Sequence, residues 1–455
     1  MPISLLILIA SATVSSGTAA TPTSSATTGA TITNVSDWTR FRGTGATSVL
    51  AERAFPGEWG EDQNIAWSVD VAGSGWSSPI VVGDRIFLSA AVDPADDGPK
   101  GMQEGVSDPS TRGAGGKPEG ELTFELSCRS LEDGSLMWTR EVGKRVPDYP
   151  VHRSNTFATE SPTSDGERVF VTFGGLGALV AYDLEGKEAW RTETGVFRTG
   201  NDFGWGISLV CHEGRVFLQN DNEEGSFIAA FDAESGKEVW RSERTTGTSW
   251  GTPAVWKTAA RTSLVASGPD SVVAYAPDTG EEHWRVQGIG GSFSSSLTFD
   301  DEHLYFGNSG PRSRGPLIAV PASAKGTIDL AGEEPAAIAW RADRAGPGFA
   351  SPLVHDGLVY VIGSTNVLAC HDAASGEQLY RERLSDAGTV VASPWIAGGE
   401  IFVLDEAGTT TVVRAGSEFE ILRTNRLPGL YWGTPSVSGD ALLLREASKL
   451  YCVRK

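Results

Sequence analysis

The chain has 455 residues, and its 58 acidic against 37 basic residues give a formal net charge of −21. A nucleic-acid binder needs a basic surface that displaces phosphate counterions, and attraction to an anionic membrane also needs basic residues, so this balance excludes both classes of partner. The 40% of hydrophobic residues suffice for a large core, and 55 Gly with 23 Pro predict many turns.

The first 36 residues differ in composition from the rest of the chain. An apolar run from Ile3 to Ala10 is followed by the small residues Thr18, Ala19 and Ala20, which predicts a secretory signal peptide over residues 1–20. A disordered apolar tail is the alternative. Residues 21–36 are rich in Thr and Ser and predict a flexible linker. No later stretch is long and apolar enough to cross a bilayer. We therefore expect a periplasmic or secreted protein without a transmembrane segment.

One pattern then recurs along the chain. It consists of small residues and Pro, an apolar run, a Gly-Asp or Gly-Glu turn, a second apolar run, and finally Ala-aromatic-Asp-x-x-x-Gly-Lys-x-x-Trp. Its first half appears as SSPIVVGDRIFL from Ser77 and ASPLVHDGLVYV from Ala350. Its second half appears as AYDLEGKEAW from Ala181 and AFDAESGKEVW from Ala230. Short alternating strands separated by such turns are typical of an all-β repeat protein.

Aligning the copies places eight residues at one position, called the anchor from here on. The anchors are Pro79, Pro162, Leu209, Pro253, Leu297, Pro352, Pro394 and Pro435. Most successive anchors are 41 to 47 residues apart, the size of a four-stranded propeller blade. Only 20 residues follow Pro435, too few for a full blade, whereas Asn64 to Val71 forms a Trp-bearing strand with no blade before it. We predict a single eight-bladed β-propeller over residues 37–455, closed by this N-terminal strand.

A tryptophan recurs at the end of the blades' outer strands. We expect each large ring to lie over a glycine turn of the neighbouring blade, where it contributes to packing. Tyr380 takes this position in the sixth blade, and the alignment assigns Leu422 to it in the seventh. The tryptophans concerned are Trp67, Trp138, Trp190, Trp240, Trp284 and Trp340.

This signature resembles the tryptophan-docking motif of the quinoprotein, or PQQ-like, propeller repeat family, from Trp38 to Lys455. The segments WTRFRG from Trp38, QNDNEEGSF from Gln219 and ASKLYCVRK from Ala447 are similar to exported bacterial members of the kind common in planctomycetes. Two related groups differ in function. The propeller lipoprotein of the β-barrel assembly machinery is a scaffold, whereas the PQQ-dependent alcohol and glucose dehydrogenases are enzymes.

The chain lacks the residues that characterise these enzymes. The alcohol dehydrogenases use two adjacent cysteines beside the cofactor, and no two of the four cysteines here are adjacent. No segment matches their Glu/Asn/Asp ligands for Ca²⁺ beside a catalytic Asp. We therefore expect no catalytic residue and no cofactor. A PQQ-dependent dehydrogenase with PQQ and calcium remains the alternative, and a carbohydrate-active propeller enzyme a second one.

The loops that lead into the innermost strands carry the strongest candidate site. In a propeller these loops gather around the mouth of the central channel, so their aromatic residues would form a collar suited to binding a flat ring, a sugar or a peptide. A plug that only fills the channel is the alternative. The predicted collar consists of Trp76, Trp205, Trp250, Phe293, Phe349 and Trp432.

Three further segments are candidates for recognition. His152, Arg153 and Asn155 form a polar cluster before the second blade that could hold an anion or an oxygen-rich ligand, or could serve only as turn residues. Asp221, Asn222 and Glu223 are weak candidates for a metal site, because they offer oxygen ligands without the Asp-x-Asp-x-Asp-Gly spacing. Residues 92–121 are rich in Gly, Pro and Asp and predict a flexible insertion in blade 1.

Together these features predict a non-catalytic, exported binding or scaffold propeller. We expect it to be a monomer whose partner is a protein or a small extracytoplasmic ligand at the channel mouth.

Overall fold

The computed structural model describes Met1 and residues 37–93, 95, 98–99, 101, 116–291, 293–308, 315–332, 337–363 and 366–455. The predicted signal peptide and linker, and most of the predicted insertion at 92–121, lie outside these residues. The chain divides into two units, Met1–Thr31 and Ile32–Lys455. All described strands belong to the second unit.

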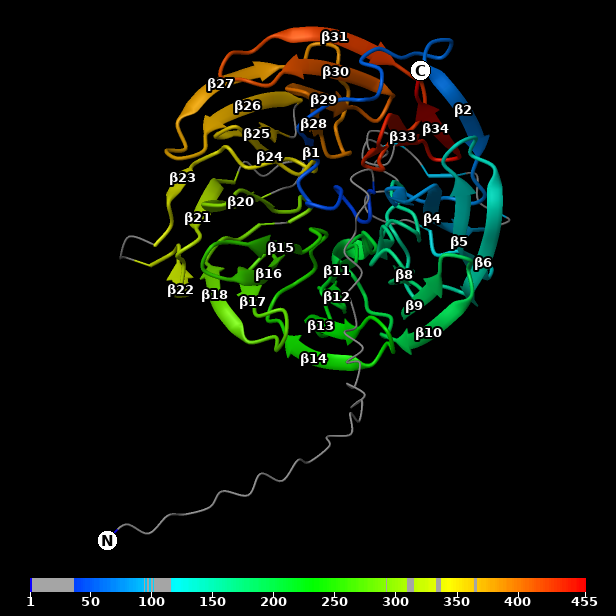
Figure 1. Cartoon of the computed structure of the whole chain (residues 1–455), viewed down its shortest axis with the longest axis horizontal. Helices are drawn as coiled ribbons and strands as arrows, with labels where there is room; N and C mark the ends of the chain where they lie inside the picture. The colour runs from blue at the N-terminus through cyan, green and yellow to red at the C-terminus, as the bar shows by residue number, and fades with distance from the viewer. Residues whose placement is uncertain are drawn as a thin grey trace. The chain divides into compact units, whose positions relative to one another are not determined.

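The second unit is an eight-bladed β-propeller, as predicted, with its sheets arranged in a ring (Figure 1). Blade 1 contains β3 (Ile80–Val82), β4 (Arg85–Val92), β5 (Leu122–Ser130) and β6 (Leu136–Arg145). Blade 2 contains β7 (Thr163–Ser164), β8 (Arg168–Phe173), β9 (Ala178–Asp183) and β10 (Glu188–Glu193). Blade 3 contains β11 (Val210–His212), β12 (Arg215–Asn220), β13 (Phe227–Asp232) and β14 (Glu238–Glu243). Blade 4 contains β15 (Ala254–Lys257), β16 (Thr262–Ser267), β17 (Ser271–Tyr275) and β18 (Glu282–Gln287).

The other four blades follow the same antiparallel order. Blade 5 contains β19 (Thr298–Phe299), β20 (His303–Gly307), β21 (Leu317–Pro321) and β23 (Trp340–Ala342). Blade 6 contains β24 (Leu353–His355), β25 (Leu358–Ile362), β26 (Val367–Asp372) and β27 (Gln378–Arg383). Blade 7 contains β28 (Trp395–Ala397), β29 (Glu400–Leu404), β30 (Thr409–Arg414) and β31 (Ile421–Arg426). Blade 8 contains β32 (Ser436–Ser438), β33 (Ala441–Arg445), β34 (Lys449–Val453) and β2 (Ile65–Asp70).

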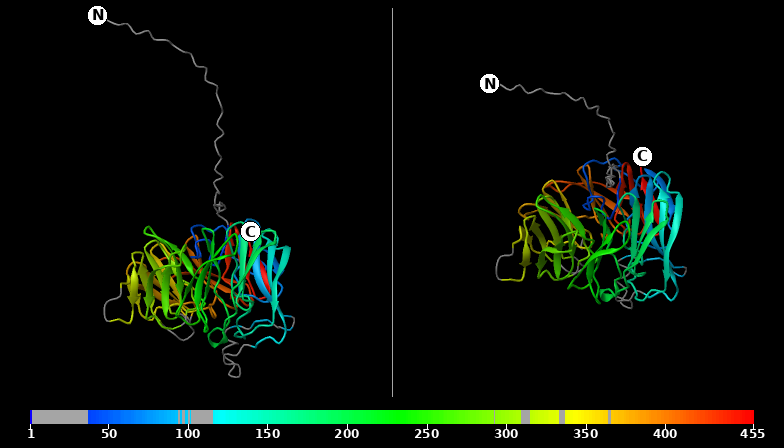
Figure 2. Two further views of the ribbon diagram at one scale, coloured as in Figure 1. Left: turned by 90° about the horizontal axis from the view of Figure 1, so that it is seen from below. Right: turned by 60° about the horizontal axis from the view of Figure 1, so that its bottom comes forward.

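The N-terminal strand closes the ring as predicted. β2 pairs antiparallel with β34, with Trp67 opposite Cys452. The C-terminus therefore lies beside β2 in every view (Figures 1 and 2). Pairing β34 with β2 satisfies the backbone groups of a strand that would otherwise be an exposed edge.

Three short elements were not predicted. β1 (Val49–Leu50) pairs in parallel with β28 of blade 7. β22 (Gly326–Asp329) leaves blade 5 and pairs in parallel with β18, the outer strand of blade 4. A 3₁₀ turn, η2 (Gly200–Asp202), lies between β10 and β11. Within the described part of the chain, no helix has the length and apolar content needed to span a bilayer.

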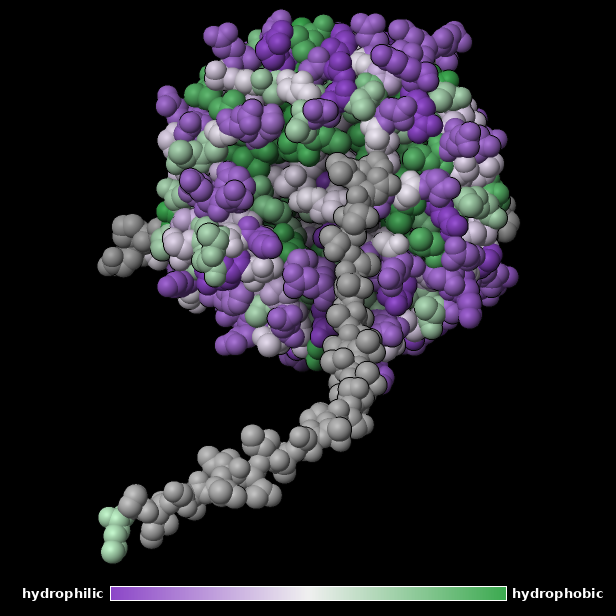
Figure 3. All heavy atoms as spheres, in the orientation of Figure 1, coloured by the Kyte–Doolittle hydropathy of each residue, from purple (hydrophilic) through white to green (hydrophobic). Residues whose placement is uncertain are grey.

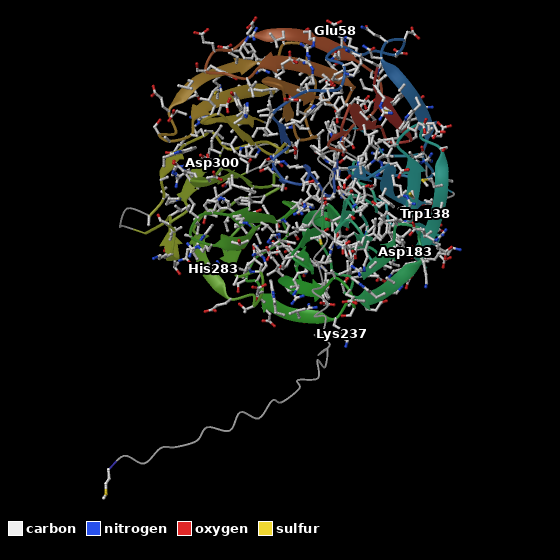
Figure 4. The ribbon with its side chains drawn as sticks, viewed as in Figure 1. Glu58, Trp138, Asp183, Lys237, His283 and Asp300 are labelled. Carbon is white, nitrogen blue, oxygen red and sulfur yellow. The ribbon has the colours of Figure 1, made fainter. Side chains whose placement is uncertain are left out.

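Five of the six docking tryptophans lie over a glycine turn, as the repeat predicts. For Trp284 the prediction is wrong, because a Cβ atom on Gly326, the glycine that follows β21 in blade 5, would meet nothing within 4 Å. The indole N–H of Trp138 donates to the carbonyl of Leu184 in blade 2 at 3.1 Å. Figure 4 labels Trp138 beside Asp183. A Cβ atom on Gly186 would come within 2.8 Å of the Trp138 ring, and Gly186 also has a positive φ of 82°. Only glycine meets both conditions without strain. The pairs Trp67–Gly134, Trp190–Gly236, Trp240–Gly280 and Trp340–Gly376 repeat the arrangement.

Blade 7 departs from the predicted alignment. Arg423, and not Leu422, occupies the docking position, since Val412 pairs with Arg423 and Val413 with Ile421. Blade 3 has the same bulge, but the turn between β30 and β31, residues 415–420, is one residue longer than the turn 233–237 between β13 and β14. The Arg423 guanidinium lies 5.9 Å from the centre of the Phe402 ring and forms an ion pair with Glu400. A cation above an aromatic ring thus replaces the indole in this blade.

The segment before β1 crosses the ring. Trp38 forms a β-bridge with Val81 of blade 1. The guanidinium of Arg42 donates at 2.7 Å to the carbonyls of Leu297 and Pro352, which are anchors of blades 5 and 6. Since these partners directly precede β19 and β24, the innermost strands of blades far from blade 1, the segment spans the channel. The sequence did not predict this crossing.

Candidate functional site

The residues leading into the innermost strands follow a period of two. In an extended chain, side chains two positions apart point to the same side. A cavity of about 280 Å³, called the channel cavity, is lined by the residues three before the anchor in all eight blades. It is also lined by the residues one before the anchor in seven blades. The first set is Trp76, Thr159, Gly206, Trp250, Ser294, Phe349, Val391 and Trp432; the second is Ser161, Ser208, Thr252, Ser296, Ser351, Ser393 and Thr434.

Five of the six predicted collar residues line this cavity. They are Trp76, Trp205, Trp250, Phe349 and Trp432. The Trp76 and Trp432 rings stack, with centroids 5.5 Å apart and planes inclined by 22°. We call these five residues the aromatic wall.

Protein acceptors fix the orientation of the wall's four indoles. Their N–H groups donate to Ser154 O at 2.8 Å from Trp76, to Phe197 O at 3.1 Å from Trp205, to Gly204 O at 2.8 Å from Trp250, and to Glu406 Oε2 at 3.3 Å from Trp432. Because these N–H groups are already paired, the indoles offer a ligand mainly their apolar surface.

Phe293 is the predicted collar residue that the structure does not place at the cavity. It lies four residues before its anchor Leu297, so its side chain points away from the axis, and Ser294 takes the lining position. Phe293 is buried in the core with its ring centroid 6.4 Å from that of Phe306. Trp205 has the same four-residue offset but still reaches the cavity, because its ring lies over Gly174, where a Cβ would come within 2.2 Å.

The residues immediately before the anchors form a second feature, which the sequence analysis missed. All eight are Ser or Thr, and in seven cases the backbone N–H of one donates to the side-chain oxygen of the next at 2.9 to 3.1 Å. We call this set the hydroxyl ring. The recurrence of Ser or Thr before each anchor is the sequence signal that could have revealed it. In order, its members are Ser78, Ser161, Ser208, Thr252, Ser296, Ser351, Ser393 and Thr434.

The ring leaves hydrogen-bonding capacity for a ligand. Each of the seven lining hydroxyls accepts a backbone N–H, and none donates its own hydrogen to a described protein atom. A hydroxyl can accept twice and donate once, so each keeps one donor and one acceptor position. This series of hydrogen bonds is interrupted between Thr434 and Ser78. The buried Oγ of Ser78 has no described partner. There Arg445 joins blades 8 and 1 by donating to Ser77 O at 3.0 Å and Ser89 O at 2.8 Å.

Phe41 lines the cavity from the crossing segment. Its neighbours in sequence contact the innermost strands at or beyond the anchors: the carbonyl of Thr39 accepts the Ser164 N–H at 2.9 Å, and Arg42 bonds to two anchor carbonyls. The collar precedes the anchors, so the segment lies toward the opposite end of the channel. Phe41 thus forms an apolar floor.

No charged side chain is among the described residues that line the channel cavity. The charge lies elsewhere: hydrophilic residues gather on the periphery in Figure 3, and the labelled Glu58, Asp183 and Lys237 lie at the outer edge in Figure 4. PQQ is an anionic quinone that carries carboxylates, and it would need cationic partners or a bound metal ion. The lining offers neither a Lys or Arg nor a carboxylate to hold Ca²⁺, so it does not fit this cofactor.

The three residues of the predicted polar cluster do not line one common site. Asn155 lines the channel cavity, with its Nδ2 donating to Phe203 O at 2.6 Å. His152 is buried behind Phe203, with the two ring centroids 4.8 Å apart, and burial lowers its pKa. His152 and Arg153 line an adjoining cavity of about 550 Å³ beside blade 1. Of the three, only Asn155 touches both cavities.

The loop with the weak metal candidates uses its oxygens internally. Asp221 forms a buried ion pair with Arg244, with Oδ1 and Nε 2.7 Å apart. Asn222 Oδ1 accepts the N–H groups of Glu224 and Gly225, and Glu223 accepts two bonds from Thr248. Among the described residues, no three His, Cys, Asp or Glu side chains converge as a metal site requires.

Glu160 is a buried acid that the sequence analysis did not single out. It lies between the lining residues Thr159 and Ser161 but points away from the axis, where its Oε1 accepts the Gly174 N–H at 2.8 Å. Burial raises its pKa to about 7. Together with Asp221 it lines a cavity of about 30 Å³ behind Trp205, separate from the channel cavity.

A sequence model of a family described as outer membrane protein assembly factor BamB matches the chain over residues 124–229, 224–328 and 324–418. No curated protein sequence matches the chain significantly. The family matches cover most of blades 1 to 7, the part of the chain with complete repeats.

Solved structures of several proteins share the fold. BamB from Moraxella catarrhalis has a TM-score of 0.56 and 13% identity, covering 85% of this chain and 96% of that one. A europium-containing methanol dehydrogenase has a TM-score of 0.61 and 11% identity, covering 92% and 98%. A quinohemoprotein alcohol dehydrogenase from Comamonas testosteroni has a TM-score of 0.60 and 13% identity, covering 93% and 82%. An assembly factor and two dehydrogenases therefore share one architecture, which does not choose between their functions.

Proposed function

Because this chain belongs to the PQQ-like repeat family described as outer membrane protein assembly factor BamB, we propose that it is a non-catalytic propeller that binds its ligand at the channel mouth. The channel cavity is the site. The aromatic wall and the hydroxyl ring bind the ligand, and no residue is assigned a catalytic role.

The single observation that carries this proposal is the lining of the channel cavity. Binding requires shape, apolar surface and a few oriented polar groups, and the cavity has all three. Acid–base or covalent catalysis requires a titratable or nucleophilic group within hydrogen-bond reach of the ligand. The described lining holds only aromatic, aliphatic, amide and alcohol side chains, and the seven lining hydroxyls of the hydroxyl ring have no base as a described partner. Ser154 differs from them, because its Oγ lies 2.6 Å from His152 Nδ1.

Export and a monomeric state belong to the same proposal. The apolar run from Ile3 to Ala10 supports export, as does the family's description as an outer membrane assembly factor. The exposed large hydrophobic side chains support a monomer, since few are described as exposed and Val239, Leu379 and Ile421 lie on three separate blades, apart from the group at β6 and Val146.

Titration with PQQ and Ca²⁺ tests the proposal against the dehydrogenase alternative. A ligand of the native state raises the melting temperature by mass action. We expect neither a shift nor dye-linked oxidation of a panel of alcohols and sugars. Turnover that depends on PQQ would overturn the non-catalytic assignment.

A second measurement tests the location of binding. A library of neutral, anionic and cationic small molecules is screened by thermal shift against the wild-type protein and Trp250→Ala. We expect compounds that stabilise the wild type to lose their effect in this variant. Hits that are insensitive to Trp250→Ala and to Trp432→Ala would place binding elsewhere and overturn the channel-mouth site.

A further inference from the structure

The channel cavity combines three properties in one space. It has flat aromatic surfaces on its wall, alcohol groups around its circumference and no charged side chain among its described lining residues. From this combination we propose that the ligand is a small, uncharged carbohydrate, which rests on the proposed function and names its ligand class.

The aromatic wall suits one face of a sugar ring. A pyranose presents C–H bonds on its faces and hydroxyl groups around its edge, so it packs flat against an aromatic ring. Trp250, Phe349 and Trp432 are only half-buried, which leaves part of each ring open to the cavity. The indole N–H groups of Trp250 and Trp432 are already bonded to the protein, so their rings are held in place before a ligand arrives.

The hydroxyl ring suits the edge of the same molecule. Each of the seven hydroxyls of the hydroxyl ring that line the cavity has one donor and one acceptor position left, and a sugar hydroxyl needs the same two partners. The N–H bonds between neighbouring blades fix the seven oxygens at regular positions, as the 3.0 Å bond from Ser296 N to Ser351 Oγ shows. Binding a rigid sugar to a rigid ring therefore requires little ordering of the protein.

Charge and size exclude other classes of ligand. An acidic or basic ligand would lose water in the cavity without gaining a charged partner, which is unfavourable. The volume of about 280 Å³ lies near the lower limit of the roughly 300–1,000 Å³ typical of small-molecule sites. Phe41 forms a floor, so an extended peptide could not thread through the channel. These limits favour a monosaccharide or disaccharide.

The test is calorimetric titration of the full chain with neutral sugars and their charged counterparts. Glucose, galactose, mannose, maltose and cellobiose are compared with glucuronic acid, galacturonic acid and glucosamine. We expect at least one neutral sugar to bind, and its acidic counterpart to bind about tenfold more weakly or worse, because its carboxylate would be desolvated without a partner.

Variants locate the sugar on the wall. We expect Trp250→Ala and Phe349→Ala each to weaken binding roughly tenfold, since each removes a stacking surface. Trp250→Phe keeps an aromatic face and should bind within a few fold of wild type. Trp190→Phe, at a docking position on the outer strand β10, is the matched control and should bind as wild type does. The melting temperature of each variant shows that it is folded.

The outcomes separate the two proposals. If no neutral sugar binds but other library compounds stabilise the protein in a Trp250-dependent way, the carbohydrate assignment is overturned and the binding function stands. If a uronic acid binds as tightly as its neutral counterpart, the charge argument is wrong and the assignment falls. If neither sugars nor library compounds bind, both proposals fall.

Discussion

Two arginines are fully buried in the propeller without an acidic partner. Arg42 bonds to the anchor carbonyls of blades 5 and 6, and Arg445 bonds to carbonyls of blade 1. Burial lowers the pKa of each guanidinium to about 9, so both stay charged at neutral pH. The planar guanidinium can reach two carbonyls at once, which makes each residue a link between separate parts of the ring.

Glu160 gives the stability of the protein a specific pH dependence. Its pKa is raised from 4.5 to about 7 by burial, so the folded state keeps a proton that the unfolded chain has released between these values. Stability from this group is complete below pH 4.5 and is lost as the pH rises through 7. We expect the free energy of unfolding of the wild type to fall by on the order of 3 kcal/mol relative to Glu160→Gln across this window.

Urea unfolding at pH 5 and pH 8 measures this difference. Glu167→Gln is the control, because Glu167 is an exposed acid on a nearby turn and should follow the wild type. Parallel pH profiles of the wild type and Glu160→Gln would show that Glu160 is not protonated in the folded state.

The buried pair of Asp221 and Arg244 should be far more sensitive than a surface pair. Asp221→Ala leaves the Arg244 charge buried with Tyr275 as its remaining described partner, which we expect to destabilise the protein by about 3–5 kcal/mol. Glu238→Ala breaks the exposed pair with Arg241 and should change stability by about 1 kcal/mol or less. Urea unfolding of both variants checks the contrast, and equal effects would contradict the buried pairing.

At the scale of the element, each outer strand combines exposed positions with one buried ring. In β10 and β14 only the docking tryptophan is buried, whereas the three inner strands of most blades are buried almost throughout. The indole ring fills the space between one blade and the glycine turn of the next. The contact between blades therefore depends on a side chain from the most exposed strand.

Trp190→Ala should test this contact. Trp190 packs near Phe170 and donates its N–H to Ala233 O at 3.0 Å, so its removal opens a cavity between blades 2 and 3. We expect a loss of about 3–5 kcal/mol in the free energy of unfolding, measured in urea. Val239→Ala, at an exposed position of β14, is the control and should change stability by about 0.5 kcal/mol or less. A similarly small effect of Trp190→Ala would show that the indole does not hold the blades together.

At the scale of the whole molecule, the N-terminal residues close the ring in two ways. β2 completes blade 8, and the crossing segment connects the innermost strands of blades 1, 2, 5, 6 and 7. Both elements come from the stretch 38–70. The propeller therefore depends on contacts between residues at opposite ends of the chain.

A truncated chain that begins at Gly73 should lose its cooperative fold. It exposes the backbone groups of β34 and uncovers the core that Trp38, Phe55 and Trp59 share with blades 7 and 8. We expect aggregation in size-exclusion chromatography and no cooperative thermal transition. A chain that begins at Asp37 keeps every described contact of the propeller and should melt as the full chain does. A monomeric, cooperative protein starting at Gly73 would contradict the proposed closure.

The repeat alone determined the architecture. Eight anchors, the docking tryptophans and the unpartnered strand near Trp67 are local patterns that recur in sequence, so they can be counted without knowing the contacts. Five collar residues were found in the same way, because the loop before each innermost strand has a fixed place in a blade.

Only the tertiary structure decided which side chains face the channel and what closes it. Side-chain direction in an extended chain alternates with every residue, so an offset of one position turned Phe293 into the core and Ser294 toward the axis. One additional residue in the turn before β31 likewise moved the docking position of blade 7 from Leu422 to Arg423. The crossing segment lies outside the repeats, so no recurring pattern predicts it. Arg42 bonds to carbonyls 255 and 310 residues away. Contacts at such separations exist only once the ring has closed, because closure is what brings those residues together.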